Sequence, residues 1–410
     1  MRCGTGKPDT RRRRRAAGAL LALALLAAAS GAVCTAGPRL SPQAYKALVQ
    51  VQELMDQGNY RAAEQQLKEL LPQLVARGYD QAVALQTLAG AQAARNDYTH
   101  AAQSLRKSLD LNVLPPDSRQ RVRYDLAQLY LASDVPEMAV PVLESWFEHA
   151  DRPTADAWFL LGLARVQAKR YRQAIEPLQK AIAAVENADE TWYQTLLAAH
   201  FELDALQECA TVLEKMVRLF PDRDYWQQLA GVYLALQQDG RALTTLELAW
   251  RQDRLSGESD LLQLAQLYLA QRIPFKAAQL LEREMDRGRI GIDADNLELL
   301  AGAWAEARER DKAIAVYQRA MHAGAKASLG LHVAQLYIED ERWRDAARVL
   351  DASLHKGGLD KPGEAWLLLG IARFESAEPE RARDAFARAM DYKKQRSEAR
   401  AWLDHLQATL

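Results

Sequence analysis

The sequence has little of what interrupts helices or cross-links a fold. Its 410 residues include only 21 glycines, 14 prolines and three cysteines, and aromatic residues make up 7%. Cys209 is the one cysteine well inside the chain beyond its N-terminal segment, which excludes an intramolecular disulfide there. No linker rich in proline, glycine or serine separates one half from the other. Because alanine, leucine, glutamine, arginine and glutamate dominate instead, the composition favours one continuous helical array.

The first 36 residues differ in kind from the rest. A basic block, Arg11–Arg15, precedes an apolar run of 14 residues, Ala16–Ala29, and small residues follow. A membrane-spanning helix needs about 20 apolar residues, so residues 1–36 are typical of a secretory signal peptide. We therefore predict a periplasmic protein, and the alternative is an inner-membrane protein anchored by an uncleaved signal. Val33 precedes Cys34 where a lipidated cysteine normally follows a small residue, which disfavours lipidation.

Removal of this segment leaves an acidic chain. Residues 37–410 contain 46 lysines and arginines against 53 aspartates and glutamates, a net charge near −7. A general nucleic-acid binder needs clustered positive charge to meet the phosphates. The composition therefore argues against nucleic acid as a partner.

One short phrase returns along the chain. LAQLYLA occupies residues 126–132 and again residues 264–270, and residues 333–339 read VAQLYIE. Aligned on these copies, the chain divides into units of 33 to 38 residues, with a leucine, a small residue and an aromatic or long residue followed nine residues later by alanine. Spacings of three and four place each set on one helix face, and the break between the sets marks a turn. Each unit is therefore predicted to be a hairpin of two antiparallel helices.

The repeated positions define a predicted core. The small residue lets the paired helix approach closely, while the leucine and aromatic side chains fill the space on either side. The residues predicted to form this core are Leu126, Ala127, Tyr130, Trp158, Leu161, Gly162, Ala174, Trp226, Ala230, Tyr233, Leu264, Ala265, Tyr268, Trp304, Trp366 and Gly370. His200 falls at such a position, which predicts a buried imidazole with its hydrogen bonds satisfied rather than a metal ligand.

This pattern resembles the tetratricopeptide repeat, which pairs Trp, Leu, Gly and Tyr on a first helix with Ala, Phe, Ala and Pro on a second. The resemblance implies an all-α fold, a right-handed α-solenoid in which each hairpin packs on its neighbours. Leu197 departs from the pattern by replacing the small residue, and Arg165 and Arg373 by replacing the tyrosine. Residues 44–396 hold ten units, and residues 397–410 form a predicted capping helix. The units begin near Ala44, Ala82, Gln120, Ala155, Glu190, Arg223, Glu258, Ala294, Ala327 and Gly363.

Surfaces rather than motifs are then expected to carry the function. In tetratricopeptide arrays the first helices line a concave groove, and removing the core positions from these helices leaves the residues that face it. The predicted groove presents amide and apolar side chains from Gln52, Gln128, Leu131, Phe159, Leu163, Phe201, Leu234, Gln266, Leu269 and Gln335. Glutamines can satisfy the backbone of an extended guest while the apolar residues accept its side chains, which predicts a protein or peptide partner. The alternative for each residue is a contact with a neighbouring repeat.

No catalytic or metal-binding motif accompanies the repeats. The seven histidines are scattered, without an HExxH motif or the cysteine and histidine spacing that holds zinc. Paired acids such as Glu339 and Glu341 fall at expected helix ends and turns, which favours solvated charge. We therefore predict a protein that is not an enzyme and that uses no cofactor and no metal. A hydrolase with its site in the groove is the remote alternative.

Four longer phrases resemble one family of Gram-negative bacteria. They are YKALVQVQELMDQGNYRAAEQQL, PTADAWFLLG, ESDLLQLAQLYLAQRIPFKAAQLLE and KPGEAWLLLGIA. These phrases are similar to exported tetratricopeptide proteins described as components of TonB systems, which act with a proton-driven ExbB/ExbD motor. The resemblance implies an accessory or scaffold role in energised outer-membrane transport, with TonB-system components as partners. The alternative is a periplasmic assembly factor for outer-membrane, cell-wall or exopolysaccharide machinery.

Overall fold

The computed structural model describes residues 38–221, 223–324 and 328–409. All regular structure in these residues is helical, which confirms the predicted all-α class. The chain forms two compact units that divide between Val212 and Leu213. The right-handed sense of the winding stays a prediction.

Two sequence predictions concern residues beyond these ranges. The predicted signal segment 1–36 with Cys34 lies outside the described residues, and so does the predicted repeat start Ala327. Among the helices of the described ranges, none combines the length and the apolar character that crossing a bilayer demands.

Helix pairs joined by short turns make up both units. The first unit contains α2 (Pro42–Asp56) with α3 (Tyr60–Leu70) and a 3-10 helix η1 (Leu71–Leu74), α4 (Gly78–Ala94) with α5 (Tyr98–Asp110), α6 (Pro116–Ala132) with α7 (Pro136–Phe147), α8 (Ala155–Gln167) with α9 (Tyr171–Ala183), and α10 (Glu190–Glu202). The division between the units lies within α11 (Leu206–Leu219). The second unit continues with α12 (Arg223–Ala235) and α13 (Asp239–Arg251), α14 (Glu258–Ala270) and α15 (Pro274–Asp286), α16 (Ala294–Glu306) and α17 (Arg310–His322), α18 (Leu329–Glu339) and α19 (Trp343–Lys356), α20 (Pro362–Glu375) and α21 (Pro379–Ala389), and α22 (Arg396–Thr409).

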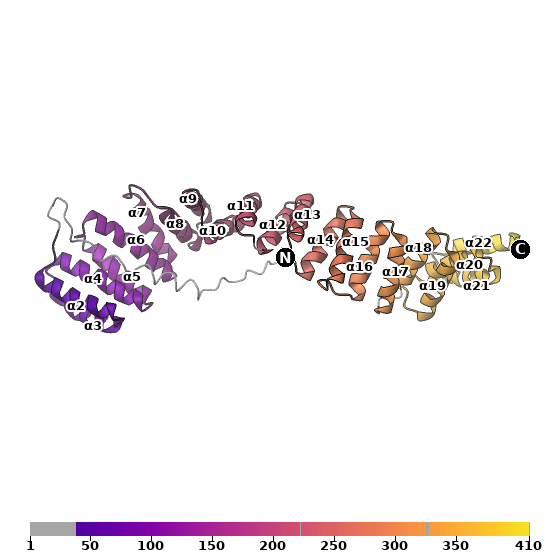
Figure 1. The fold of residues 1–410 in the computed structure, drawn as a ribbon, viewed down its shortest axis with the longest axis horizontal. Coiled ribbons are helices and arrows are strands. Elements are labelled where there is room, and N and C mark those ends of the chain that lie inside the picture. Colours follow the sequence, from indigo (N-terminus) through magenta and orange to yellow (C-terminus); the bar gives the residue numbers. More distant parts are fainter. Residues whose placement is uncertain (1–37, 222, 325–327, 410) are drawn as a thin grey trace. The chain divides into compact units, whose positions relative to one another are not determined.

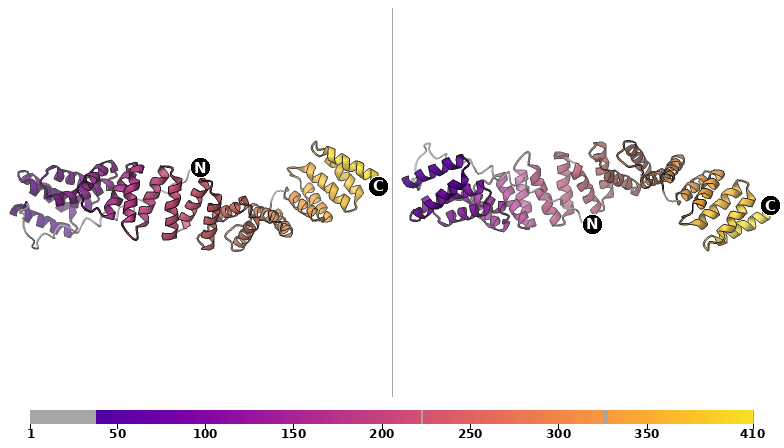
Figure 2. Two further views of the ribbon diagram at one scale, coloured as in Figure 1. Left: turned by 90° about the horizontal axis from the view of Figure 1, so that it is seen from above. Right: turned by 90° about the horizontal axis from the view of Figure 1, so that it is seen from below.

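We call the opening helix of each pair the first helix and its partner the second helix. A second helix packs on its own first helix and also on the next one, as α9 does with α8 and α10 (Figure 1). In the second unit α17 packs in the same way on α16 and α18. Figure 2 gives two further views of the helices. Because one pair has too little apolar area to be stable alone, this sharing of second helices is what stabilises each unit.

The turn inside every pair uses the same backbone conformation. In the turn between α4 and α5, Asn96 N donates to Ala93 O and Asp97 N donates to Gln92 O, both at 2.9 Å, which ends the helix with a Schellman motif. The residue two positions after each first helix has a positive φ, and these residues are Gly58, Asn96, Asp134, Lys169, Asp204, Gln237, Arg272, Arg308, Glu341 and Ala377. Only one of them is glycine, so the other turns hold residues whose Cβ disfavours this conformation.

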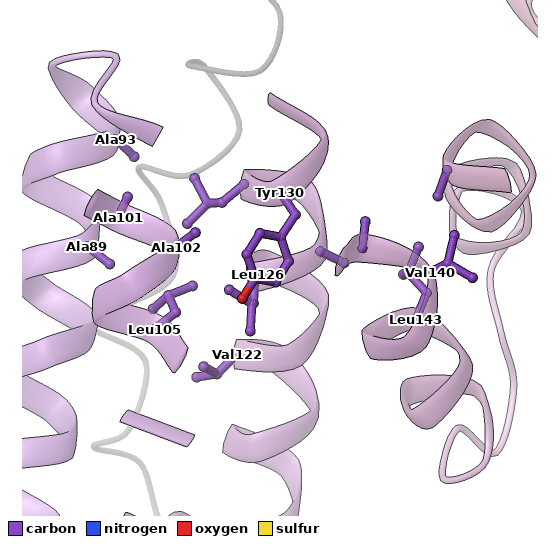
Figure 3. Close-up of a cluster of buried hydrophobic side chains, with 14 of the residues drawn as sticks. Ala89, Ala93, Ala101, Ala102, Leu105, Val122, Leu126, Tyr130, Val140 and Leu143 are labelled. Carbon is purple, nitrogen blue, oxygen red and sulfur yellow. The ribbon is translucent and has the colours of Figure 1, made fainter. Parts of the chain in front are cut away.

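The core of the first unit shows how the repeated positions pack. Leu126 and Tyr130 of α6 lie with Leu105 of α5 and Leu143 of α7 in one buried cluster (Figure 3). Leu126 is 2% exposed and its counterpart in the second unit, Leu264, is fully buried. The two copies of the repeated phrase therefore place the same residue in the same kind of surroundings.

Two tryptophans among the predicted core residues lie at the rim instead. Trp158 and Trp366 are half-buried, whereas the other predicted core residues are buried. The ring of Trp158 contacts Phe147, with 4.4 Å between ring centroids, and Lys180 Nζ lies 4.5 Å from the Trp158 ring centre. A ring this large covers the end of the core while one edge stays in water, which corrects the prediction for Trp158 and Trp366. Trp226, at the same repeat position, is buried as predicted.

Small residues are required where paired helices come closest. A Cβ at Gly162 would lie 2.5 Å from Leu178 Cγ, and a Cβ at Gly370 would collide with the ring of Phe386. Leu197 occupies the equivalent position in α10 and is itself buried. At that position the pair accommodates the larger side chain, whereas at the two glycines it has no room for one.

The two arginines that replace the tyrosine connect neighbouring pairs. Arg165 Nη2 donates to Glu144 Oε1 of the preceding second helix at 2.9 Å, and its Nη1 donates to the carbonyl oxygen of Gln173 in its own pair at 2.9 Å. Arg373 repeats this arrangement in the second unit, with Nη2 donating to Asp351 Oδ2 at 2.6 Å. The substitution therefore replaces an aromatic contact with charge-assisted hydrogen bonds across two pairs.

A final unpaired helix covers the last pair of the second unit. On α22, Trp402 stacks on Phe386 with 5.5 Å between centroids and 7° between ring planes, and Leu406 is 1% exposed. Asp404 and His405 on the same helix are exposed. The helix thus buries its apolar side and turns charge and imidazole to solvent, which is how a terminal repeat stays soluble.

Candidate functional site

The candidate site lies on the side of the first helices that the second helices leave uncovered. We call this surface the first-helix face and define it from the residues predicted to line a groove. In the first unit they are Gln52, Gln128, Leu131, Phe159, Leu163 and Phe201, and in the second unit they are Leu234, Gln266, Leu269 and Gln335. Phe201 and Gln266 are exposed and the other eight are half-buried, so all ten side chains reach the surface.

Helix geometry groups several of these side chains. Phe159 and Leu163 lie one turn apart on α8. The ring of Phe159 stacks on Trp192 of α10, with 5.1 Å between centroids and 14° between ring planes. Phe159 therefore contacts a neighbouring repeat, which is the alternative interpretation of this residue. Trp192 lies one residue outside the repeat register, so the repeat pattern did not predict this contact.

Three of the glutamines already make hydrogen bonds. Gln52 Nε2 donates to a carboxylate one turn further along α2 at 2.8 Å, and Gln128 bonds to the side chain of Tyr124 within α6. Gln335 Nε2 donates to Glu364 Oε1 of the next first helix at 3.3 Å. A glutamine amide has two donor hydrogens and a carbonyl acceptor. Each of these side chains therefore keeps capacity for a guest, and Gln335 also connects two repeats.

An aromatic run beside this face in the first unit was missed by the sequence reasoning. The ring of Tyr124 lies 5.4 Å from that of Trp146, which lies 5.1 Å from Phe147, and Phe147 contacts Trp158 at 4.4 Å. These four rings join α6, α7 and α8. Trp146 and Phe147 lie at the end of a second helix, outside the repeated positions, so the repeat pattern gave no signal for them.

Asp125 gives the same region a desolvated carboxyl group. Burial raises the pKa of Asp125 to about 6, although Arg121 acts in the opposite direction. Burial, then Asp156 and then Asp125, raise the pKa of the neighbouring Tyr124 hydroxyl to about 12. A carboxylate that has lost part of its water gains from hydrogen-bond donors or a positive charge. This part of the face can therefore accept backbone N–H groups or a cation from a guest.

Hydrogen bonds connect neighbouring first helices in the second unit. Gln227 Nε2 of α12 donates to Asp260 Oδ2 of α14 at 2.5 Å. Asn296 Nδ2 of α16 donates to Glu258 Oε1 of α14 at 3.2 Å. With the bond between α18 and α20 already described, these contacts join three pairs of successive first helices.

The first helices of the second unit are acidic. Helices α12, α14, α16, α18 and α20 carry nine acids against two arginines, and the acids are Asp224, Glu258, Asp260, Asp295, Glu298, Glu306, Glu339, Glu364 and Glu375. One of the two arginines, Arg373, forms an ion pair with Asp351 of the preceding second helix. The five first helices of the first unit carry eight acids against five basic residues. The excess of acidic over basic residues is therefore larger on the first helices of the second unit than on those of the first.

Two buried titratable groups are held in their neutral forms. His200 is 4% exposed and its Nδ1 has no hydrogen-bond partner among the described residues, which corrects the prediction of satisfied hydrogen bonds. Burial lowers the pKa of His200, so the apolar surroundings select the neutral ring, which tolerates an unpaired nitrogen better than a charged one would. Burial raises the pKa of the Cys209 thiol to about 11. Both residues therefore act as packing side chains.

Three open depressions lie away from the predicted groove residues. One of about 450 Å³ lies at the turns of the last two pairs, around Trp343 and Ala377. Another of about 550 Å³ lies beside Trp250, and a third of about 480 Å³ lies between Val75 and Leu111. In the described ranges, no three His, Cys, Asp or Glu side chains gather as a metal site.

Comparison with known proteins returns structural similarity only. No protein-family model and no curated protein matches the sequence. A tetratricopeptide repeat protein from Parabacteroides merdae is 16% identical, over 64% of this chain and 99% of its own, with a TM-score of 0.38. MamA from Desulfovibrio magneticus is 23% identical, over 44% and 97%, with a TM-score of 0.37. YrrB, described as a protein of this repeat class with an unusual peptide-binding site, is 18% identical, over 43% and 88%, with a TM-score of 0.36.

At TM-scores this low the similarities carry no argument about function. The assignment of the fold rests on the described helices, because first helices in both units bury the leucine and the small residue of the repeat pattern, as Leu161 with Gly162 and Leu264 with Ala265 do. The chain is thus an array of hairpins like tetratricopeptide repeats.

Proposed function

We propose that this protein is a non-catalytic scaffold that binds another polypeptide on its first-helix face. The observation that carries the proposal is the series of leucine, phenylalanine and glutamine side chains that reach the surface from helices whose other positions fill the core. Apolar side chains exposed together on a folded surface mark interaction sites more often than single ones do. Ten helix pairs offer such a surface repeatedly, which suits an extended guest.

The chemistry of the face supports a polypeptide guest. Leu163, Leu234 and Leu269 provide apolar area for side chains, and the glutamine amides can donate to backbone carbonyls and accept from backbone N–H groups. The partly desolvated Asp125 adds an acceptor in the first unit. A guest therefore gains hydrogen bonds from its backbone and apolar burial from its side chains, the combination found in protein interfaces.

The non-catalytic part of the proposal rests on what the reactive side chains do. Cys209 is fully buried and burial raises its thiol pKa to about 11, so the nucleophilic thiolate is disfavoured. His200 is buried, burial lowers its pKa, and its Nδ1 has no hydrogen-bond partner among the described residues that would orient the ring as a base. Both residues serve the core between helices rather than the first-helix face.

Crosslinking in cells tests the face directly. A photoreactive amino acid placed at Gln128, Leu163 or Leu269 is expected to capture a protein partner, because these side chains reach the surface on first helices. Matched controls carry the same group at the exposed second-helix residues Gln103 and Gln279. Equal capture from first and second helices would show that the first-helix face is not the binding surface.

We further propose that the protein works in the periplasm as an accessory component of a TonB-type energy-transduction system. The support is the signal-like segment 1–36 and the phrases that resemble exported proteins described with TonB systems. Mass spectrometry of the mature N-terminus is expected to show cleavage after Gly31, Ala32 or Ala36, and an intact Met1 would favour the anchored form instead. Co-purification after crosslinking is expected to recover TonB, ExbB or ExbD, whereas synthases or outer-membrane assembly proteins would favour the assembly-factor alternative.

A further inference from the structure

On α16 a missing side chain opens the first-helix face down to a tyrosine hydroxyl. Gly302 has no side chain, and the nearest group to a Cβ built there is the hydroxyl oxygen of Tyr317, 3.8 Å away on α17. Tyr317 is 7% exposed. Its hydroxyl makes no hydrogen bond within the described ranges but is accessible to water, so a buried ring presents an accessible oxygen beneath the glycine. An accessible phenol oxygen can exchange its water for a hydrogen-bond donor of a ligand.

Two carboxylates flank this opening. Glu298, Gly302 and Glu306 are spaced by four residues, so they lie along one side of α16 with the glycine in the middle. Both glutamates are exposed and neither forms an ion pair within the described ranges. After burial, Glu298 and then Glu306 are the groups that raise the pKa of Tyr317, which shows that both charges act on the same hydroxyl.

Two nearby basic residues contact other groups. Arg310 pairs with Glu339 at 3.2 Å, and Lys312 Nζ lies 4.1 Å from the ring centre of Trp304. On the other side, the ring of His332 on α18 stacks on Tyr317 with 6.1 Å between centroids and 13° between planes. The opening is therefore bounded by the stacked rings of Tyr317 and His332, by two carboxylates without ion pairs in the described ranges, and by the tyrosine hydroxyl.

We propose that Glu298, Gly302, Glu306 and Tyr317 form a notch that receives the cationic side chain of a lysine or arginine from the bound polypeptide. A cationic group would donate to the tyrosine oxygen while the two carboxylates supply the opposite charge. The inference rests on the proposed function, since it names the chemistry of the guest that the first-helix face holds. The notch would fix the position of the guest along the first-helix face, because a basic residue of the guest must lie at Gly302.

Peptide binding to the full chain tests the notch. The probe is a fluorescein-labelled peptide of alternating lysine and alanine, compared with the same peptide carrying glutamine in place of lysine. We expect the lysine probe to bind more tightly than the glutamine probe, and the double variant Glu298→Gln with Glu306→Gln to weaken it by about tenfold, equivalent to about 1.4 kcal/mol. Gly302→Leu is expected to weaken it similarly by filling the opening.

The matched control removes two exposed carboxylates from second helices, Asp286→Asn with Asp384→Asn, and is expected to leave binding within about twofold. Circular dichroism checks that each variant is folded. Gly302 is half-buried and a Cβ there makes only an ordinary contact, so the helix is expected to accept a leucine at this position. Equal loss in the notch and control variants, or equal binding of the two probes, would overturn the notch. Capture of a partner by the crosslinkers at Gln128 and Leu163 would in that case still support the proposed function.

Discussion

The two units pack in the same way but present different surfaces. In the first unit the first-helix face adjoins stacked aromatic rings and a partly desolvated carboxyl group, Asp125. In the second unit it is aliphatic and acidic, with an opening at Gly302. The repeated core positions specify the helix pair, so the positions outside them are free to differ. The proposed guest would therefore meet different chemistry on each unit.

Deleting the repeated leucine tests the shared packing and should have the largest effect. Leu126→Ala and Leu264→Ala are each expected to reduce the free energy of unfolding by about 2 to 5 kcal/mol, because both leave cavities in equivalent cores. Urea unfolding followed by circular dichroism measures the loss, with exposed Gln103→Ala and Gln279→Ala as controls. A large loss of unfolding free energy from one substitution and none from the other would show that the two units do not share the same packing.

The pH dependence of stability tests what sets the first unit apart. The folded pKa of Asp125, about 6, is above its ordinary value, so the folded state holds this proton more tightly than the unfolded chain. Its contribution is therefore favourable at low pH and is lost as the pH rises from about 4 to about 6, by at most about 3 kcal/mol. Asp125→Asn is expected to flatten this part of the profile in urea unfolding. An unchanged slope would mean that the carboxyl group is well solvated.

The arginines that replace tyrosine test whether both units connect their pairs alike. Arg165→Met and Arg373→Met are each expected to lower the free energy of unfolding by about 1 kcal/mol, since each removes charge-assisted hydrogen bonds to a carboxylate that water can still reach. Arg172→Met and Arg388→Met, on exposed second-helix positions, are the controls for denaturant unfolding. Tolerance of Arg373→Met alone would show that the second unit does not depend on this contact.

The turns offer the smallest and most uniform effect. Lys169→Gly and Ala377→Gly are each expected to stabilise the chain by about 0.5 to 1 kcal/mol, because glycine adopts the positive φ of these turns without the Cβ penalty. Thermal unfolding reports the gain. The reverse change at the one turn that already has glycine, Gly58→Ala, is expected to destabilise, and a gain there would contradict the explanation.

Much of the fold could be predicted because a helix pair is encoded locally. The alignment of repeats placed units near Ala155 and Glu190, where α8 and α10 begin, and the small residue at Gly162 meets Leu178 as the pattern requires. Spacings of three and four follow from the helix period itself, so they can be read without knowing which pair lies beside which. The face could be predicted only as a set of positions left over from the core.

The sequence alone therefore determined the helical class, the repeated pair and most of the residues that pack inside it. Only the tertiary structure decided that Phe159 stacks on Trp192, that Arg165 reaches Glu144, and that the Tyr317 hydroxyl lies beneath Gly302. The reason is that these contacts join different helices, and their distances depend on how the helices pack rather than on the spacing within either one.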